Sequence, residues 1–228
     1  MLGTKDGLNT GEMVWGELPS TYSSDYKVQL NALDAKVKFC IKYNSTNIDA
    51  SKSSPRYWQV FNVPSSAYLM SRPETPVGVT FFNTEEAYFE GTEVDGNDDV
   101  WQVFSFYMIE NRQSARASIE GLPTPDYYLR ELQEKDYTAS EVNGDWVYAP
   151  ANGTYVQFDV VLGLTTAGIQ NILDDPDMNH ALTSEALFTI HLGDFTSSSG
   201  GTHDYDNYSV ERSHAYTYYI TIENSKKI

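Results

Sequence analysis

The stretch KVKFCIKY, residues 36–43, decides the fold class because its apolar and polar positions alternate strictly. One side of the pattern carries Val37, Phe39, Ile41 and Tyr43, and the other carries Lys36, Lys38, Cys40 and Lys42. A period of two is typical of a β-strand that buries one face and leaves the other solvated or thinly covered. We therefore expect a strand here, with the Val37 side in the core.

The same period recurs along the rest of the chain. It appears in TYVQFDVVLGL (154–164), LFTIHL (187–192) and AYTYYITI (215–222), whereas VWQVFSFYMIE (100–110) is apolar on both faces and predicts a central strand. Gly, Ser, Asn, Asp and Pro fill the connections, as expected between strands. The sequence thus predicts an all-β fold, an antiparallel β-sandwich.

One or two short helices are expected beside the strands. The segment 126–136 has Asp126 as its candidate N-cap, and the segment 165–175 ends before Pro176. The seven residues predicted to line the core through the last two long strands are Phe188, Ile190, Leu192, Tyr216, Tyr218, Ile220 and Ile222.

Composition excludes several classes of function. The chain has 228 residues, 32 acidic against 15 basic, and a net charge of −17, which argues against binding nucleic acid. Its single cysteine, Cys40, rules out an intrachain disulfide and a cysteine-based zinc site. There is no apolar run long enough to span a membrane. The first residues are polar and lack the core of a signal peptide, so we expect an intracellular protein or a processed or truncated form.

Histidine is the first candidate for chemistry. The four histidines show no HExxH spacing, and His191 is expected to be the outward member of an alternating strand, a surface or satisfied side chain without a catalytic role. The loop around His203, Asp204 and Asp206 carries side chains that a divalent ion could use, although such residues more often serve turn geometry.

A weak calcium candidate lies in EVDGNDDVW, residues 93–101. Its oxygen-bearing residues are Asp95, Asn97, Asp98 and Asp99. The stretch lacks the distal Glu of an EF-hand, and Asp-Gly followed by acids is also a common hairpin turn. We expect no cofactor and no catalytic residue, because nucleophile-elbow, P-loop and dinucleotide motifs are absent.

Two alternatives stay open at this point. A paired-carboxylate hydrolase site can be built from residues distant in sequence. Surface tyrosines and tryptophans can form a sugar-stacking platform, although core and cross-strand packing is the favoured reading of these aromatics.

Five stretches, in this order, resemble the fimbrillin-like proteins of Bacteroidales, the type V pilins and surface fimbrial adhesin subunits. They are YWQVFNVPSSAYL (57–69), FSFYMIENRQ (104–113), GDWVYAPANGTYVQFDVVL (144–162), ALFTIHLGDF (186–195) and YDNYSVERSHAYTYYITIEN (205–224). The similarity runs from about residue 28 to 224. It implies transthyretin-like β-sandwich domains in which the last two of these stretches form paired C-terminal strands.

The resemblance also implies an exported protein, usually made as a lipoprotein precursor. In such pilins an arginine-directed protease removes an N-terminal segment, and subunits join by strand exchange. This chain departs from that pattern: it has no lipoprotein signal, Cys40 lies inside a predicted strand, and GEMVWGELP (11–19) resembles the middle of the family's N-terminal domain. The stretch SRPETP (71–76) reads either as an interdomain link or as a turn. If it is a link, we expect an N-terminal β segment over 1–72, read as part of a first sandwich domain, and a C-terminal fimbrillin-like domain over 73–228.

The expected function is therefore structural. The chain is predicted to be a subunit or an accessory tip or anchor component of a cell-surface fimbrium, associated with the outer membrane and not an enzyme. Its expected partners are other fimbrial subunits, further copies of itself in a homopolymer, or host or bacterial surface ligands. The alternatives are a non-polymerising surface module that binds a glycan or a host protein and, less favoured, a hydrolase with dispersed carboxylates.

Overall fold

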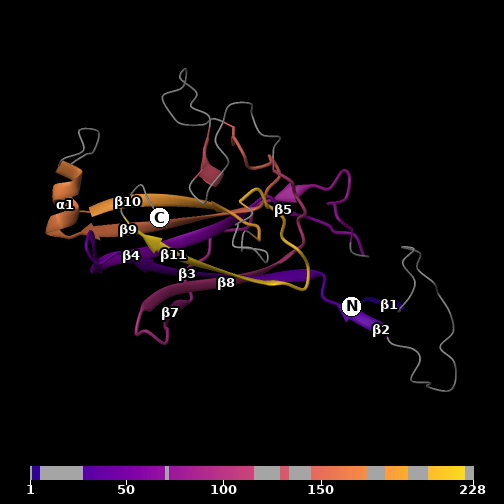
Figure 1. Ribbon diagram of the computed structural model, residues 1–228, viewed down its shortest axis with the longest axis horizontal. Helices are drawn as coiled ribbons and strands as arrows, with labels where there is room; N and C mark the ends of the chain where they lie inside the picture. The colour runs from indigo at the N-terminus through magenta and orange to yellow at the C-terminus, as the bar shows by residue number, and fades with distance from the viewer. Residues whose placement is uncertain are drawn as a thin grey trace.

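The computed structural model describes residues 2–5, 28–69, 72–115, 129–133, 145–173, 183–194 and 205–223. Within these ranges the protein is mostly β, with one short α-helix (Figure 1). The strands are β1 (Leu2–Lys5), β2 (Val28–Asn31), β3 (Asp34–Tyr43), β4 (Ile48–Phe61), β5 (Val63–Pro64), β6 (Phe81–Phe82), β7 (Gly91–Val94), β8 (Val100–Ile109), β9 (Tyr155–Leu164), β10 (Thr183–His191) and β11 (Ala215–Ile222). The helices are the 3-10 turn η1 (Leu129–Glu131) and α1 (Thr166–Leu173).

Two larger sheets make up the body of the protein. One is three-stranded and antiparallel, in the order β10-β9-β4, and the other is four-stranded, in the order β11-β3-β8-β7. β8 lies between β3 and β7, so the prediction of a central strand is confirmed. In Figure 1 the helix α1 lies at one end of the long strands and the β1–β2 pair lies beyond the other.

The four-stranded sheet is mixed, so the expectation of a purely antiparallel arrangement is wrong. β11 runs parallel to β3, with Ala215 beside Lys36 and Ile222 beside Tyr43. The two strands begin at the same end because the chain enters β11 next to the start of β3, where the Lys36 N–H donates to the His214 carbonyl at 3.0 Å.

The last two strands are not paired with each other, which corrects a second expectation. β10 pairs with β9, and β11 pairs with β3 in the other sheet. The chain therefore crosses from one sheet to the other between them. The Tyr218 hydroxyl ties the two ends of this crossing together, since it accepts from the Gly193 N–H and donates to the Gly193 carbonyl, each at 2.9 Å.

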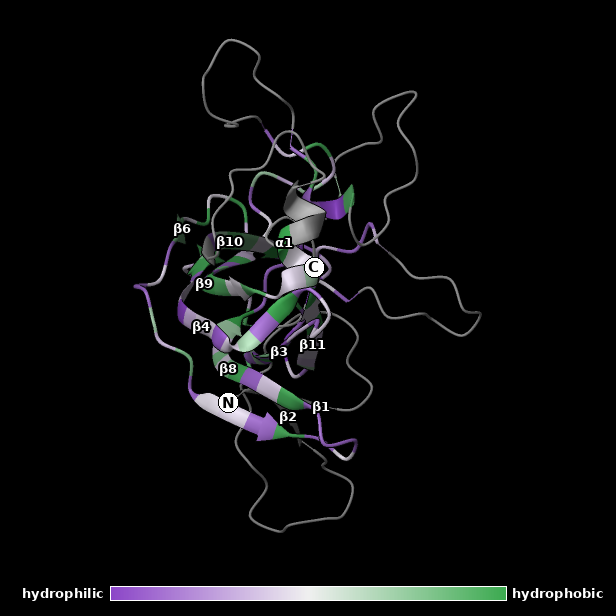
Figure 2. Ribbon diagram, turned by 90° about the vertical axis from the view of Figure 1, so that its left-hand side faces the viewer, coloured by the Kyte–Doolittle hydropathy of each residue, from purple (hydrophilic) through white to green (hydrophobic). Residues whose placement is uncertain are grey.

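The two sheets share one hydrophobic core. Across the core, Trp58 of β4 stacks on Phe104 of β8 with ring centroids 4.6 Å apart, and Phe39 of β3 lies 6.5 Å from Phe158 of β9. All seven residues predicted to line the core through β10 and β11 are buried in it, which confirms that prediction. Figure 2 shows hydrophobic and hydrophilic positions together along the strands, as expected for strands that bury one face.

Strands on the two sides of residue 72 belong to the same sheets. β3 pairs with β8 and β11, and β4 pairs with β9. Residues 34–61 and the later strands therefore bury their apolar faces against each other.

The short helices agree in part with the sequence. α1 confirms the helix expected within 165–175. Of the segment 126–136, the structure describes residues 129–133, where η1 is a three-residue turn; the remainder lies outside the described residues. Among the described residues, no helix is long and apolar enough to cross a membrane.

Candidate functional site

His191, at the end of β10, is fully buried, so the expectation that it faces outward into solvent is wrong. Its side chain does lie on the face opposite Phe188 and Ile190, as the alternation predicts. That face is not solvated at this end of the sheet because η1 packs on β10 there. Alternation gave the correct face, but it carries no information on what a distant segment places over that face.

Glu131 of η1 binds both the backbone and the side chain of His191. One carboxylate oxygen accepts from the His191 N–H at 2.7 Å, and the other lies 2.5 Å from Nδ1 of the ring. Nδ1 of the ring thus has Glu131 as its hydrogen-bond partner. Nε2 is buried and has no hydrogen-bond partner within the part of the chain that the structure describes.

The neighbouring Arg130 is also fully buried and holds several backbone carbonyls. Its guanidinium donates to the carbonyls of His191 and Leu192, at 3.3 Å each, and to those of Tyr205 and Asn207. The same guanidinium lies over the Tyr208 ring, 4.1 Å from its centroid. Arg130 and Glu131, consecutive residues of η1, thus connect the end of β10 to the segment that leads to β11 through hydrogen bonds.

Aromatic rings close the rest of the His191 environment. Trp146 lies edge to face with the imidazole, with centroids 4.6 Å apart, and Tyr155 and Tyr208 lie 5.1 and 5.8 Å away. A carboxylate and an imidazole in contact suit general-base chemistry, but here the imidazole is fully buried, whereas the Glu131 side chain is 21% exposed. Within the described ranges, no group of three or more His, Cys, Asp or Glu residues could hold a metal ion.

The outer face of the three-stranded sheet continues from this buried end into solvent. The register places three rows across β10, β9 and β4: His191, Tyr155 and Phe61; Thr189, Gln157 and Gln59; Leu187, Asp159 and Tyr57. Tyr155 and Phe61 stack in parallel with centroids 4.8 Å apart, and Trp146 stands 5.9 Å from Tyr155. The face therefore carries a partly exposed aromatic shelf beside a row of amide and hydroxyl groups.

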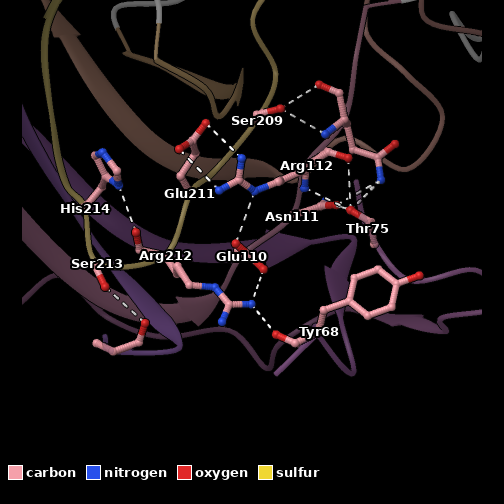
Figure 3. Close-up of polar contacts among 12 residues, drawn as sticks. Tyr68, Thr75, Glu110, Asn111, Arg112, Ser209, Glu211, Arg212, Ser213 and His214 are labelled. Atoms are coloured by element: carbon pink, nitrogen blue, oxygen red, sulfur yellow. Dashed lines mark hydrogen bonds and ion pairs between the residues drawn. The ribbon is translucent and has the colours of Figure 1, made fainter. Parts of the chain in front are cut away.

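A second buried polar cluster surrounds Glu110, directly after β8 (Figure 3). Glu110 binds Arg212 through one oxygen and Arg112 through the other, the latter at 3.2 Å. Arg112 also pairs with Glu211, and Arg212 donates to the carbonyls of Tyr68 and Leu69. The cluster fastens the segment before β11 to β8 and to the chain after β5, and its carboxylate is fully occupied by cations.

Two carboxylates are buried among the described residues, those of Glu110 and Asp159. Glu110 lies at the end of the four-stranded sheet, whereas Asp159 belongs to β9 and pairs with Arg56 at 3.3 Å. Each is held by arginine, and each belongs to a different sheet.

The weak calcium candidates form the turn of the β7–β8 hairpin. One oxygen of Asp95 accepts from the N–H groups of Asn97 and Asp99, and the other accepts from the Trp101 indole at 2.9 Å. The indole bond and the backbone bonds lower the pKa of Asp95. Asp98 has a φ of 63°, and Asp99 pairs with Lys42 at 2.5 Å. The Asp95 oxygens are used to build the turn of the hairpin.

The structure describes only some of the other histidine-bearing candidates. His214 Nδ1 lies 2.8 Å from the Arg212 carbonyl, beside the Glu110 cluster. His180, His203 and Asp204 lie outside the described residues, and Asp206 is exposed. The residues that sequence reasoning missed are Glu131, Arg130, Glu110 and Arg212. Nothing in their local pattern marks them, because each acquires its partner from a segment far away in the chain.

Comparisons with known proteins add no identification. A scan against protein-family models gives no match, and a search of curated proteins gives no significant match.

Proposed function

We propose that the chain is a structural subunit or an accessory component, at the tip or anchor, of a bacterial cell-surface fimbrium. In this proposal the two-sheet core is a transthyretin-like sandwich of the fimbrillin type. The proposal rests on the ordered resemblance over about residues 28–224, together with a mostly β body whose sheets share one core. The fold by itself does not specify a function.

The observation that supports the proposal most is that the outer edge of β11 is unpaired among the described residues. β11 is an edge strand of its sheet. The Asn44 N–H donates to the Ile222 carbonyl, and the Lys36 N–H donates to the His214 carbonyl. By the alternation of a parallel ladder, the N–H and C=O groups of Thr217, Tyr219 and Thr221 then point away from β3. Among the described residues, no strand pairs with this edge, which is the geometry that accepts a strand from a partner.

The position of β11 favours an accessory role over that of a strand donor. Tyr216, Tyr218, Ile220 and Ile222 are buried in the chain's own core. A strand that completes its own subunit is not available to complete another. We therefore favour a tip, cap or anchor component that receives a neighbouring subunit.

Protease-resistant ladders in unheated SDS samples of surface material test assembly directly. We expect the chain to migrate in such ladders, and we expect Tyr219→Pro to remove it from them, because proline cannot donate the outward hydrogen bond yet is tolerated on an edge strand. Tyr219→Ala is the matched control and should assemble. A chain that stays monomeric and never enters fimbrial fractions would refute the proposal.

A second candidate function is a surface module that binds a glycan, and the shelf of Trp146, Tyr155 and Phe61 favours it. Aromatic rings stack against the apolar faces of sugars, and Gln59, Gln157 and Thr189 supply hydrogen-bonding groups in the next row. Arg56 is balanced by Asp159 and Glu185, so the face suits a neutral sugar.

Binding of neutral hexasaccharides, namely cellohexaose, xylohexaose, maltohexaose and mannohexaose, tests this second function. We expect at least one to bind and Gln157→Ala to weaken that binding, whereas Thr217→Ala on the other sheet should leave it unchanged. Absence of binding to all four at millimolar concentration would exclude this function for neutral chains of that length.

A further inference from the structure

β10 is the edge strand of the three-stranded sheet, and its outer edge is divided into a capped end and an open part. The Leu192 N–H donates to the Thr154 carbonyl at 2.8 Å, in line with the β10–β9 register. By antiparallel alternation, the residues whose backbone groups face away from β9 are then Leu187, Thr189 and His191. The capped end is His191, and the open part contains Leu187 and Thr189.

The cap occupies both outward backbone groups of His191. Glu131 accepts its N–H, and Arg130 donates to its carbonyl. These are the two bonds that a neighbouring strand would otherwise make. Proteins protect edge strands in this way, with charged groups or a covering segment, because an unpaired edge is a template for another strand.

The open part carries one charged side chain, that of Glu185, which pairs with Arg56 of the same sheet. The stretch Glu185-Ala-Leu-Phe-Thr189 contains no proline and no lysine, and the β10–β9 register runs through it without a bulge. Leu187 is 57% exposed at its centre, and no strand of the described residues pairs with this edge. An exposed leucine on an unbroken edge indicates a surface that is covered in an assembly.

We propose that this open edge pairs antiparallel with the same edge of a second copy, about a two-fold axis at Leu187. In this register Leu187 lies against Leu187 of the other copy. Glu185 of each copy lies against Thr189 of the other. An apolar pair at the centre and a charged residue against a hydroxyl leave no like charges opposed. The two three-stranded sheets become one continuous sheet, and such a contact is isologous.

Arg130 and Glu131 set where the pairing ends. Because they hold both backbone groups of His191, the ladder stops at Thr189 on each side and contains three hydrogen-bonded residue pairs. A ladder this short gives a weak dimer, so association is expected only at high protein concentration. This inference is independent of the proposed fimbrial function, which uses the edge of β11 in the other sheet.

Sedimentation of the full chain as a function of concentration tests the dimer, with Leu187→Lys and Tyr219→Lys as matched variants. Both residues are exposed on edge strands, so both variants should keep the circular dichroism and melting temperature of the parent. Leu187→Lys should raise the dimer dissociation constant about tenfold or more, because two lysines then face each other at the axis. Tyr219→Lys should leave it unchanged, and an equal mixture of Leu187→Lys and Leu187→Glu should restore association.

A cross-link gives a second, geometric readout. Hydrogen-bonded antiparallel pairs have Cα atoms about 5.5 Å apart, which lies within the range that a disulfide spans. Mild oxidation of Leu187→Cys should give a covalent dimer, and Tyr219→Cys should not. A chain that is monomeric up to about 1 mM, or a dimer that Leu187→Lys does not weaken, overturns the proposal.

Discussion

At the scale of single residues, the buried polar groups decide how the ends of the strands are held. Glu131 satisfies two nitrogen atoms of His191, and Glu110 neutralises two arginines. Buried groups of this kind stabilise little in net terms when paired, but removing one partner leaves the other unsatisfied at a large cost.

Replacing Glu131 with alanine should therefore destabilise the protein by about 2–4 kcal/mol, because two buried donors of His191 lose their acceptor. Chemical denaturation measures the difference. Glu93→Ala is the control: its exposed pair with Lys38 should contribute less than about 1 kcal/mol. Equal effects of the two substitutions would contradict the buried contact.

Asp95 gives a pH-dependent prediction. Its bonds to the Trp101 indole and to backbone N–H groups lower its pKa in the folded state, so its contribution is present above the unfolded pKa and is lost as the pH falls through the folded pKa. Asp95→Asn should therefore be less stable than the parent at neutral pH, because the uncharged amide accepts the hydrogen bond of the Trp101 indole more weakly than the carboxylate does. The difference should shrink below about pH 4. Urea denaturation from pH 2 to 7 measures it, and a difference that grows on acidification would refute the assignment.

At the scale of elements, β11 is both an edge strand and a major part of the core. Its burial alternates residue by residue, with the even-numbered positions from Tyr216 to Ile222 turned inward. This alternation makes the strand sensitive to substitution on one side only.

Ile222→Ala should cost about 2–5 kcal/mol of stability, the range for truncating a fully buried aliphatic side chain. Thr217→Ala, on the exposed side of the same strand, should change stability by no more than about 0.5 kcal/mol. Urea denaturation of both variants checks the pair. A small effect of Ile222→Ala would mean that β11 does not pack in its own core.

The sequence predicted most strands and their buried faces, because alternation is a local property. In β3 and in β9 the predicted inward positions, such as Phe39 and Phe158, are buried, except that Tyr43 is partly buried. It did not predict that β11 is parallel to β3 or that β10 and β11 lie in different sheets, since pairing is decided by long-range packing. The prediction that His191 is exposed was wrong for the same reason. The segment that covers His191 is η1, some 60 residues earlier in the chain.

At the scale of the whole molecule, one core joins both sheets, and buried or partly buried tyrosines lie in it and around it. Burial raises the pKa of Tyr43 to about 12 and raises the pKa values of Tyr155, Tyr208, Tyr216 and Tyr218. A raised pKa of an acid means that its stabilising contribution is complete below the unfolded pKa and is lost as the pH rises through the folded pKa.

The protein should therefore lose stability from about pH 10 upward. Absorbance at 295 nm should show the tyrosines with raised pKa values ionising together with the loss of near-ultraviolet circular dichroism. A single titration step for all 17 tyrosines in a chain that stays folded would contradict this.

The central claim, that the protein belongs to a surface fimbrium, is tested most directly by immunogold electron microscopy of the cells that produce it. Antibodies against the folded chain should label fimbriae, at their tips or bases if the role is accessory, and the label should be lost from fimbriae when the chain carries Tyr219→Pro but not Tyr219→Ala. Label confined to the cell interior, or a surface label that never coincides with fimbriae, would contradict the claim.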